Sequence, residues 1–148
     1  MSQIQLIENA ESSGARVRHR LGIVGLPGFS PVPHLLLLHQ HALELTSAEL
    51  NVYLHVFMHW FDASRFPYPH TGTIAQRMGT TKRRVQQLIN SLAKKGMLEK
   101  IPGVRKSDPK QYDVRPLLLK LQPQAREWMA QKEKAAQIER PLQLERLL

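Results

Sequence analysis

Apolar residues recur at helical spacing in three consecutive segments in the middle of the chain. The first segment begins with Thr46-Ser47-Ala48-Glu49, a capping box in which a hydroxyl and a carboxylate bond to backbone amides of the first turn. A broad apolar face follows, made of Leu50, Tyr53, Leu54, Phe57, Met58, Trp60 and Phe61. This pattern predicts the main core helix. The helix is expected to end before Phe66-Pro67-Tyr68-Pro69, because two prolines exclude its continuation.

Two further helices are predicted at close range. The first spans Thr71 to Met78 and stops at Gly79, a residue suited to a left-handed C-cap. The second spans 82–95, is capped by Thr81 and ends in two lysines followed by a glycine. Their apolar faces consist of Ile74, Ala75 and Met78 in the first helix and of Val85, Leu88, Ile89 and Leu92 in the second.

The segments on either side differ in pattern. Residues 97–101 and 111–114 alternate like strands around a polar stretch at 102–110, which predicts a β-hairpin with a long tip. Residues 2–33 are punctuated by glycine and proline and predict an extended arm, followed by a short helix over 35–42. After the hairpin, 117–121 resumes helical spacing, Pro123 is expected to interrupt it, and 125–139 is helical again.

The order of these elements predicts a mainly α fold with a small β-hairpin, the winged helix-turn-helix. Three parts are expected along the chain: an extended arm at 1–33, the winged helix-turn-helix at 34–121 and a helical tail at 122–148. The second helix of the motif, at 82–95, is the expected recognition helix, and the hairpin tip at 102–110 is the expected wing.

Charge is concentrated in the predicted motif. The chain carries a formal net charge of +9, and residues 71–120 hold twelve basic residues against three acidic ones, which already amounts to +9. Residues 1–70 sum to −1 and residues 121–148 to +1. A basic surface localised on such a motif indicates a polyanionic partner, here double-stranded DNA.

Individual roles follow from side-chain chemistry. Arginine can pair with guanine, and glutamine or asparagine with adenine, in the major groove. The predicted base-reading face carries Lys82, Arg83, Gln86, Gln87 and Asn90. Phosphate contacts fix register without reading sequence and are expected from Thr73, Arg77, Thr80 and Arg84, and in the wing from Arg105, Lys106 and Lys110. Each of Gln86, Gln87 and Asn90 is equally consistent with an ordinary surface side chain.

Residues 28–121 resemble bacterial winged-helix regulators. The similarity rests on Gly28-Phe29-Ser30-Pro31-Val32-Pro33, Leu45-Thr46-Ser47-Ala48-Glu49-Leu50, Met58-His59-Trp60, Thr73-Ile74-Ala75-Gln76-Arg77-Met78-Gly79, Arg84-Val85-Gln86 and Tyr112-Asp113-Val114. The chain is also similar, more loosely, to the amino-terminal winged helix of DnaD-type and phage replisome organisers. These resemblances imply duplex binding by residues 82–90 and self-association through elements outside the motif. The chain departs from the pattern of these families at two helix-capping positions, His70 and Thr81, where other residues are more usual.

Other kinds of site are weakly supported. His55 and His59 stand one helical turn apart, but without cysteines and with few further ligands nearby, no metal site is expected. The glycine-rich stretch at 22–28 lacks the Lys-Ser/Thr ending and the spacing of phosphate loops. No catalytic signature appears, so neither an enzyme nor a cofactor is expected. The lack of a long apolar run or an export signal predicts a cytoplasmic, nucleoid-associated protein without a membrane partner.

The flanks leave alternatives open. The apolar residues Trp128, Met129, Ala135 and Ile138 of the tail either cover the winged helix or pack on a second copy in a homodimer. Arg16, Arg18 and Arg20 either reach a DNA groove or are unstructured. The sequence predicts a sequence-specific DNA-binding protein, a transcriptional regulator. The alternative is a DNA replication initiation or primosome adaptor that binds DNA and replication proteins.

Overall fold

The computed structural model describes residues 14–147 and the side chains of residues 14–138. The chain divides into two compact units, Met1–Pro31 and Val32–Leu148. In the first unit, residues 14–21 form a helix that continues into the 3₁₀ helix η1 (Gly22–Gly25). The prediction of an extended conformation is therefore wrong for residues 14–25. Residues 15–21 contain neither glycine nor proline, and the neighbouring glycines lie at the start of the helix, Gly14, or after it, from Gly22 on. The rest of the predicted arm up to residue 13 lies outside the described residues.

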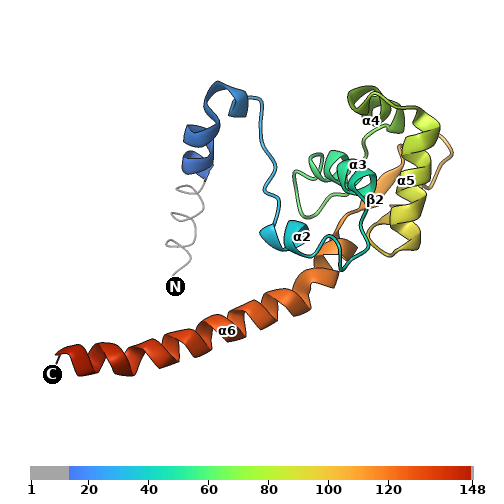
Figure 1. Cartoon of the computed structure of the whole chain (residues 1–148). Coiled ribbons are helices and arrows are strands. Elements are labelled where there is room, and N and C mark those ends of the chain that lie inside the picture. The colour runs from blue at the N-terminus through green and yellow to red at the C-terminus, as the bar shows by residue number, and fades with distance from the viewer. Residues whose placement is uncertain (1–13, 148) are drawn as a thin grey trace. The chain divides into compact units, whose positions relative to one another are not determined.

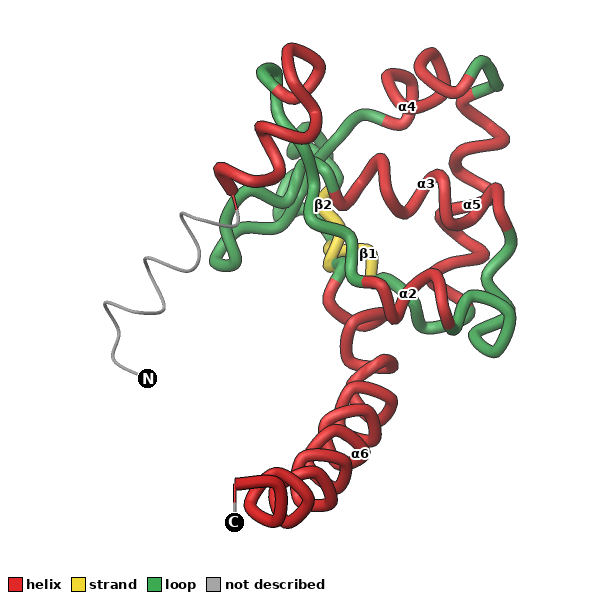
Figure 2. Tube along the Cα trace, turned by 60° about the vertical axis from the view of Figure 1, so that its left-hand side comes forward, coloured by secondary structure: helices red, strands yellow, loops and turns green. Residues whose placement is uncertain are grey.

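The second unit contains the winged helix-turn-helix, shown in Figures 1 and 2. This architecture confirms the predicted mainly α fold with a small hairpin. The short α2 helix ends four residues earlier than predicted. The elements are α2 (His34–Leu38), α3 (Ser47–Phe57), α4 (Thr71–Met78), α5 (Lys82–Lys94), β1 (Glu99–Ile101), β2 (Gln111–Asp113) and α6 (Arg115–Leu147).

The helix-turn-helix is formed as predicted. Gly79 ends α4 with a φ of 67°, in the left-handed region that favours glycine, and the Thr80 amide donates to the Ala75 carbonyl at 3.0 Å. The Thr81 hydroxyl accepts from the Arg84 amide at 3.1 Å and caps α5. The buried residues of α5, which packs on α3 and α4, are all apolar: Val85, Leu88, Ile89 and Leu92.

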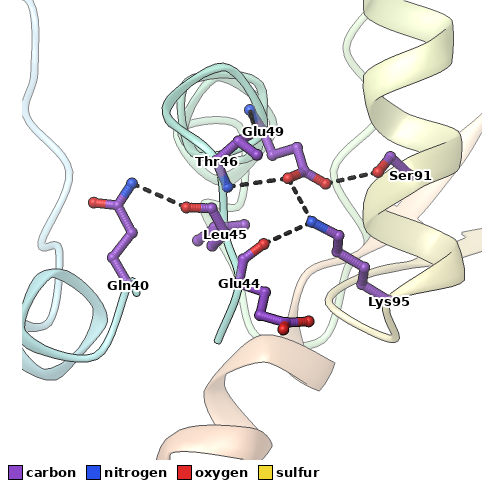
Figure 3. Close-up of polar contacts among 7 residues, drawn as sticks. All are labelled: Gln40, Glu44, Leu45, Thr46, Glu49, Ser91 and Lys95. Carbon is purple, nitrogen blue, oxygen red and sulfur yellow. Dashed lines mark hydrogen bonds and ion pairs between the residues drawn. The ribbon is translucent and has the colours of Figure 1, made fainter. Parts of the chain in front are cut away.

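A partly buried polar cluster joins α3 to α5 (Figure 3). The predicted capping box is confirmed, since Glu49 accepts from the Thr46 amide at 3.0 Å while its own amide donates to the Thr46 hydroxyl at 3.2 Å. Glu49 also accepts from the Ser91 hydroxyl at 2.7 Å and from Lys95 Nζ at 2.8 Å. Lys95 donates in addition to the Glu44 carbonyl at 2.6 Å. One carboxylate therefore caps α3 and ties it to the last turns of α5.

The α3 helix is shorter than its apolar pattern suggests. It ends at Phe57, and Met58 and Phe61 are 42% and 88% exposed, so the prediction that they belong to the core face is wrong. The amides of His59 and Trp60 bond to carbonyls three residues back, which tightens the chain out of the helix. The Asp62 carboxylate then accepts from the Ser64 amide at 2.9 Å, a local bond that competes with helix.

The hairpin is fixed to the core at its base. β1 and β2 pair antiparallel, with Lys100 opposite Tyr112. The buried Tyr53 hydroxyl donates to the Val114 carbonyl at 2.7 Å, and the Tyr112 amide donates to the Pro67 carbonyl at 2.9 Å. These bonds hold both the end of β2 and the loop before α4 in place. The predicted hairpin and its long tip are confirmed.

The α6 helix is continuous through Pro123, so the predicted interruption there is wrong. Leu117 and Leu121 are buried in the core and fix the first turns, and the residues after Pro123 are strong helix formers. Beyond Ala125 the described side chains of α6 are exposed, including Trp128 and Met129. Over residues 14–147, none of the helices combines the length and the apolar character needed to cross a lipid bilayer.

Candidate nucleic-acid interface

The outward face of α5 lies opposite its buried apolar side. By the helical period this face carries Arg83, Gln87, Asn90 and Lys94, all of them exposed. Three of the four are residues predicted to read bases. The sequence does not single out Lys94 as a site residue, because a lysine in the last turn is already explained by its favourable interaction with the helix end. Its spacing from Arg83, Gln87 and Asn90 is the signal that identifies it.

The neighbouring side of α5 faces the wing instead. Lys82, Gln86 and Lys110 line a groove of 210 Å³ between the start of α5 and the hairpin tip. Gln86 is half-buried there, so this predicted base-reading residue lies in the groove and not on the outward face. Lys100, a second residue missed in the sequence, donates to the side-chain oxygen of Asn90. The helix and the hairpin therefore form one surface.

Three of the four helix-turn-helix residues predicted to contact phosphates are exposed. Thr73, Arg77 and Arg84 are exposed, whereas Thr80 is half-buried in the turn between α4 and α5. Arg77 Nη1 lies 3.1 Å from His59 Nε2 and donates to it. These four residues thus occupy the helix-turn-helix itself, on either side of Thr81.

The wing presents its charges on a tightly built tip. Arg105, Lys106 and Lys110 are all exposed. The Arg105 amide donates to an Asp108 carboxylate oxygen at 2.7 Å, and the Asp108 amide donates to the Arg105 carbonyl at 3.0 Å. A Cβ at Gly103 would lie 2.9 Å from the Cβ of Asp108, so a larger residue there would force the tip to shift. The tip is held by its own backbone and by the Asp108 carboxylate, and its basic side chains remain exposed.

Acidic groups do not break up the basic surface. Asp113 is buried and accepts two hydrogen bonds from the Arg115 guanidinium, each of 2.9 Å. These bonds outweigh burial and hold the pKa of Asp113 below its usual value. Asp108 is committed to the tip, which leaves Glu99 as the one free carboxylate among the residues 71–120. The cluster of positive charge predicted from the sequence therefore exists as a surface.

The two histidines considered as metal ligands lie near Arg77. Burial lowers the pKa of both His55 and His59, and the Arg77 guanidinium lowers it further. One ring nitrogen of His59 is occupied by Arg77. Among the described side chains, no three His, Asp or Glu residues are grouped so that they could hold a metal ion.

Comparisons with known proteins agree with this fold. The DnaD N-terminal domain family matches residues 32–133. The crystal structure of the N-terminal domain of DnaD from Geobacillus kaustophilus is similar over 90% of this chain and 99% of that chain, with 23% identity and a TM-score of 0.51. The comparison with curated proteins gives no match.

Two more distant structures also match. A mutant of MepR from S. aureus bound to an oligodeoxyribonucleotide has 12% identity and a TM-score of 0.42, over 100% of this chain and 99% of that one. YusO from Bacillus subtilis has 15% identity and a TM-score of 0.41, over 96% and 97%. The match to the DnaD N-terminal domain family spans the whole winged helix-turn-helix and much of α6. Membership of this family suggests a DNA-binding or replication role. The chain belongs to the DnaD N-terminal domain family.

Proposed function

We propose that this protein binds double-stranded DNA, with α5 in the major groove and the wing on the backbone. The observation that carries the proposal is the exposed basic surface formed by α5 and the hairpin tip, within a segment whose net charge of +9 equals that of the whole chain. Such a surface attracts phosphates, because binding releases the counterions condensed on DNA.

The proposed roles divide along the two sides of α5. Arg83 and Gln87 point away from the core and are the candidates for reading base edges. Lys82 and Lys110 flank the groove beside them and are candidates for phosphate contacts. The basic residues of the wing tip would add sequence-independent contacts to the backbone or the minor groove.

Family membership favours a role in DNA replication, and we propose that the protein acts non-enzymatically as a replication adaptor. In this role the same chain would bind DNA and replication proteins. Transcriptional regulation is the second candidate, favoured by the outward Arg83 and Gln87, which suit sequence reading. Recovery of one preferred sequence from sheared genomic DNA would support the regulator, whereas binding without sequence preference would support the adaptor.

DNA binding itself is tested with a triple variant, Lys82→Ala/Arg83→Ala/Arg105→Ala, in a titration of labelled blunt duplex. We expect a large loss of affinity, since all three side chains are exposed on the proposed surface. The matched control is Arg126→Ala, an exposed arginine on α6. Unchanged affinity in the triple variant would contradict the proposal.

Single variants separate the roles. If the protein acts as the regulator, Arg83→Ala or Gln87→Ala should relax the preference at one base pair by about 1–3 kcal/mol, whereas Arg105→Ala should weaken binding to all sequences equally. A backbone role for all three residues would instead produce the same uniform loss in every variant.

A further inference from the structure

Two large aromatic side chains in the loop between α3 and α4 face the solvent. Phe61 is 88% exposed and Tyr68 is 59% exposed. Both line a pocket of 270 Å³. The other residues of this pocket are His59, Pro69, His70 and Thr73. Aromatic rings left exposed around a hollow indicate a binding surface, because such rings otherwise gain stability from burial.

Two prolines and a hydrogen bond to the hairpin restrain the part of the loop that carries Tyr68. Pro67 and Pro69 are buried on either side of Tyr68, and both restrict the backbone. The Pro67 carbonyl accepts the Tyr112 amide, which attaches the loop to the hairpin. The His59 ring meets the Phe61 ring edge-on, with 6.2 Å between the ring centroids. A pocket formed in advance costs little entropy when a ligand enters it.

The pocket continues into the proposed DNA-binding groove. Tyr68, Pro69 and His70 line the aromatic pocket and also the groove that contains Lys82 and Lys110. On the other side, the Arg77 guanidinium donates to His59, so a positive charge adjoins the pocket. A strand whose phosphates follow these basic groups would bring its bases to Phe61 and Tyr68. Base stacking on aromatic rings beside a basic track is how proteins hold single strands.

We propose that this pocket holds an unpaired nucleobase of a DNA strand that leaves the duplex, so that the protein prefers a junction of duplex and single strand to blunt duplex. The proposal rests on the proposed duplex binding by α5 and the wing. The base would stack on Phe61 or Tyr68, and His70 and Thr73 would offer polar groups to its edge. The volume of 270 Å³ is just below that of pockets for drug-sized ligands, about 300–1,000 Å³, and suits one base.

The test measures affinity of the full chain for a blunt duplex and for the same duplex with unpaired arms, at one salt concentration. Wild type should bind the junction more tightly. Phe61→Ala/Tyr68→Ala should reduce the preference for the junction over the blunt duplex roughly 5- to 150-fold, the range expected from base stacking. The control is Leu119→Ala, an exposed apolar residue on α6. Equal binding of both DNAs by wild type, or a preference retained in the double variant, would overturn the proposal.

A second readout reports on the base itself. With 2-aminopurine at the first unpaired position, binding of wild type should quench the fluorescence by stacking. Phe61→Tyr should preserve this quenching, and the double alanine variant should abolish it. If the double variant retains the junction preference and loses binding to a replication protein, the pocket holds a peptide and the proposal is wrong.

The experiment also separates this proposal from the one on which it rests. If wild type fails to bind blunt duplex, duplex recognition by α5 is wrong. If blunt duplex binds, depends on Lys82 and Arg83, and competes equally with the junction, only the nucleobase pocket is wrong.

Discussion

The Glu49 carboxylate lies 2.8 Å from Lys95 Nζ and connects the first turn of α3 to the residue that follows α5. The Glu49 side chain is 3% exposed and the Lys95 side chain 32%, so the pair is buried on the carboxylate side only. Because Glu49 also caps α3, one side chain fixes both the start of the core helix and the position of the candidate recognition helix against it (Figure 3).

Loss of the Glu49 charge should destabilise the fold. We expect Glu49→Gln to lower the free energy of unfolding by about 2 kcal/mol, because the hydrogen bonds to Lys95, Ser91 and Thr46 lose their ionic partner. Urea unfolding followed by circular dichroism measures the change. Gln131→Glu on α6 reverses the substitution at an exposed site and should stay within about 0.5 kcal/mol of wild type. Equal effects of the two variants would contradict a stabilising role for the cluster.

The same carboxylate should make stability depend on pH in the acid range. Burial alone would raise the pKa of Glu49, but hydrogen bonds from Lys95, Ser91 and Thr46 lower it from 4.5 to about 2. The unfolded chain therefore binds this proton more readily than the folded one. The contribution, about 3 kcal/mol at most, is fully present above pH 4.5 and is lost as the pH falls toward 2.

The difference in unfolding free energy between wild type and Glu49→Gln isolates this titration. It should be constant at neutral pH and shrink as the solution is acidified below pH 4.5. A difference that does not change down to pH 3 would show that the carboxylate is not held in its ionised form.

Local signals in the sequence predict the motif well. Three predicted features depend only on residues that are close in sequence: the Thr46 capping box, the left-handed Gly79 and the apolar positions of α5. All three are confirmed. Long-range relations are harder to predict. Nothing local indicates that Ser91 and Lys95 bond to Glu49, which lies 42 and 46 residues away.

In the candidate interface, too, local features are predictable from the sequence and long-range contacts are not. Helical spacing predicts that Arg83 and Gln87 lie on one face, and both are exposed. That Gln86 lies in a groove and that Asn90 accepts from Lys100 depends on where the hairpin packs. Phe61 continues an apolar helical pattern, yet it is exposed because the helix ends at Phe57. The pocket that it lines is therefore visible only in three dimensions.

The Tyr53 hydroxyl should stabilise the base of the wing. We expect Tyr53→Phe to cost about 1–3 kcal/mol, since the buried Val114 carbonyl loses the donor that lies 2.7 Å away. Tyr68→Phe is the matched control, because the Tyr68 side chain is largely exposed and should change stability little. Chemical unfolding of the two variants provides the comparison. A loss of less than about 0.5 kcal/mol in Tyr53→Phe would argue against this bond.

The turn between α4 and α5 should require glycine at its first position. We expect Gly79→Ala to destabilise the protein by about 1–2 kcal/mol, because its φ of 67° disfavours any side chain with a Cβ. Gly72→Ala is the control: this glycine lies within α4 with no atom within 4 Å of an added Cβ, so alanine should stabilise the helix by up to about 1 kcal/mol. Thermal unfolding should move in opposite directions for the two variants, and a shift in the same direction would contradict this assignment of the turn.

Salt dependence should count the phosphates that the basic surface neutralises. If about six are contacted, the logarithm of duplex affinity should fall with the logarithm of salt concentration with a slope of about −5. Lys94→Ala and Arg105→Ala should each reduce the size of the slope by about 1, because each removes one exposed cation from the surface. Gln87→Ala carries no change in charge and should weaken binding with the slope unaltered. A slope that stays the same in Lys94→Ala would exclude this lysine, identified by its position on the outward face of α5, from contact with DNA.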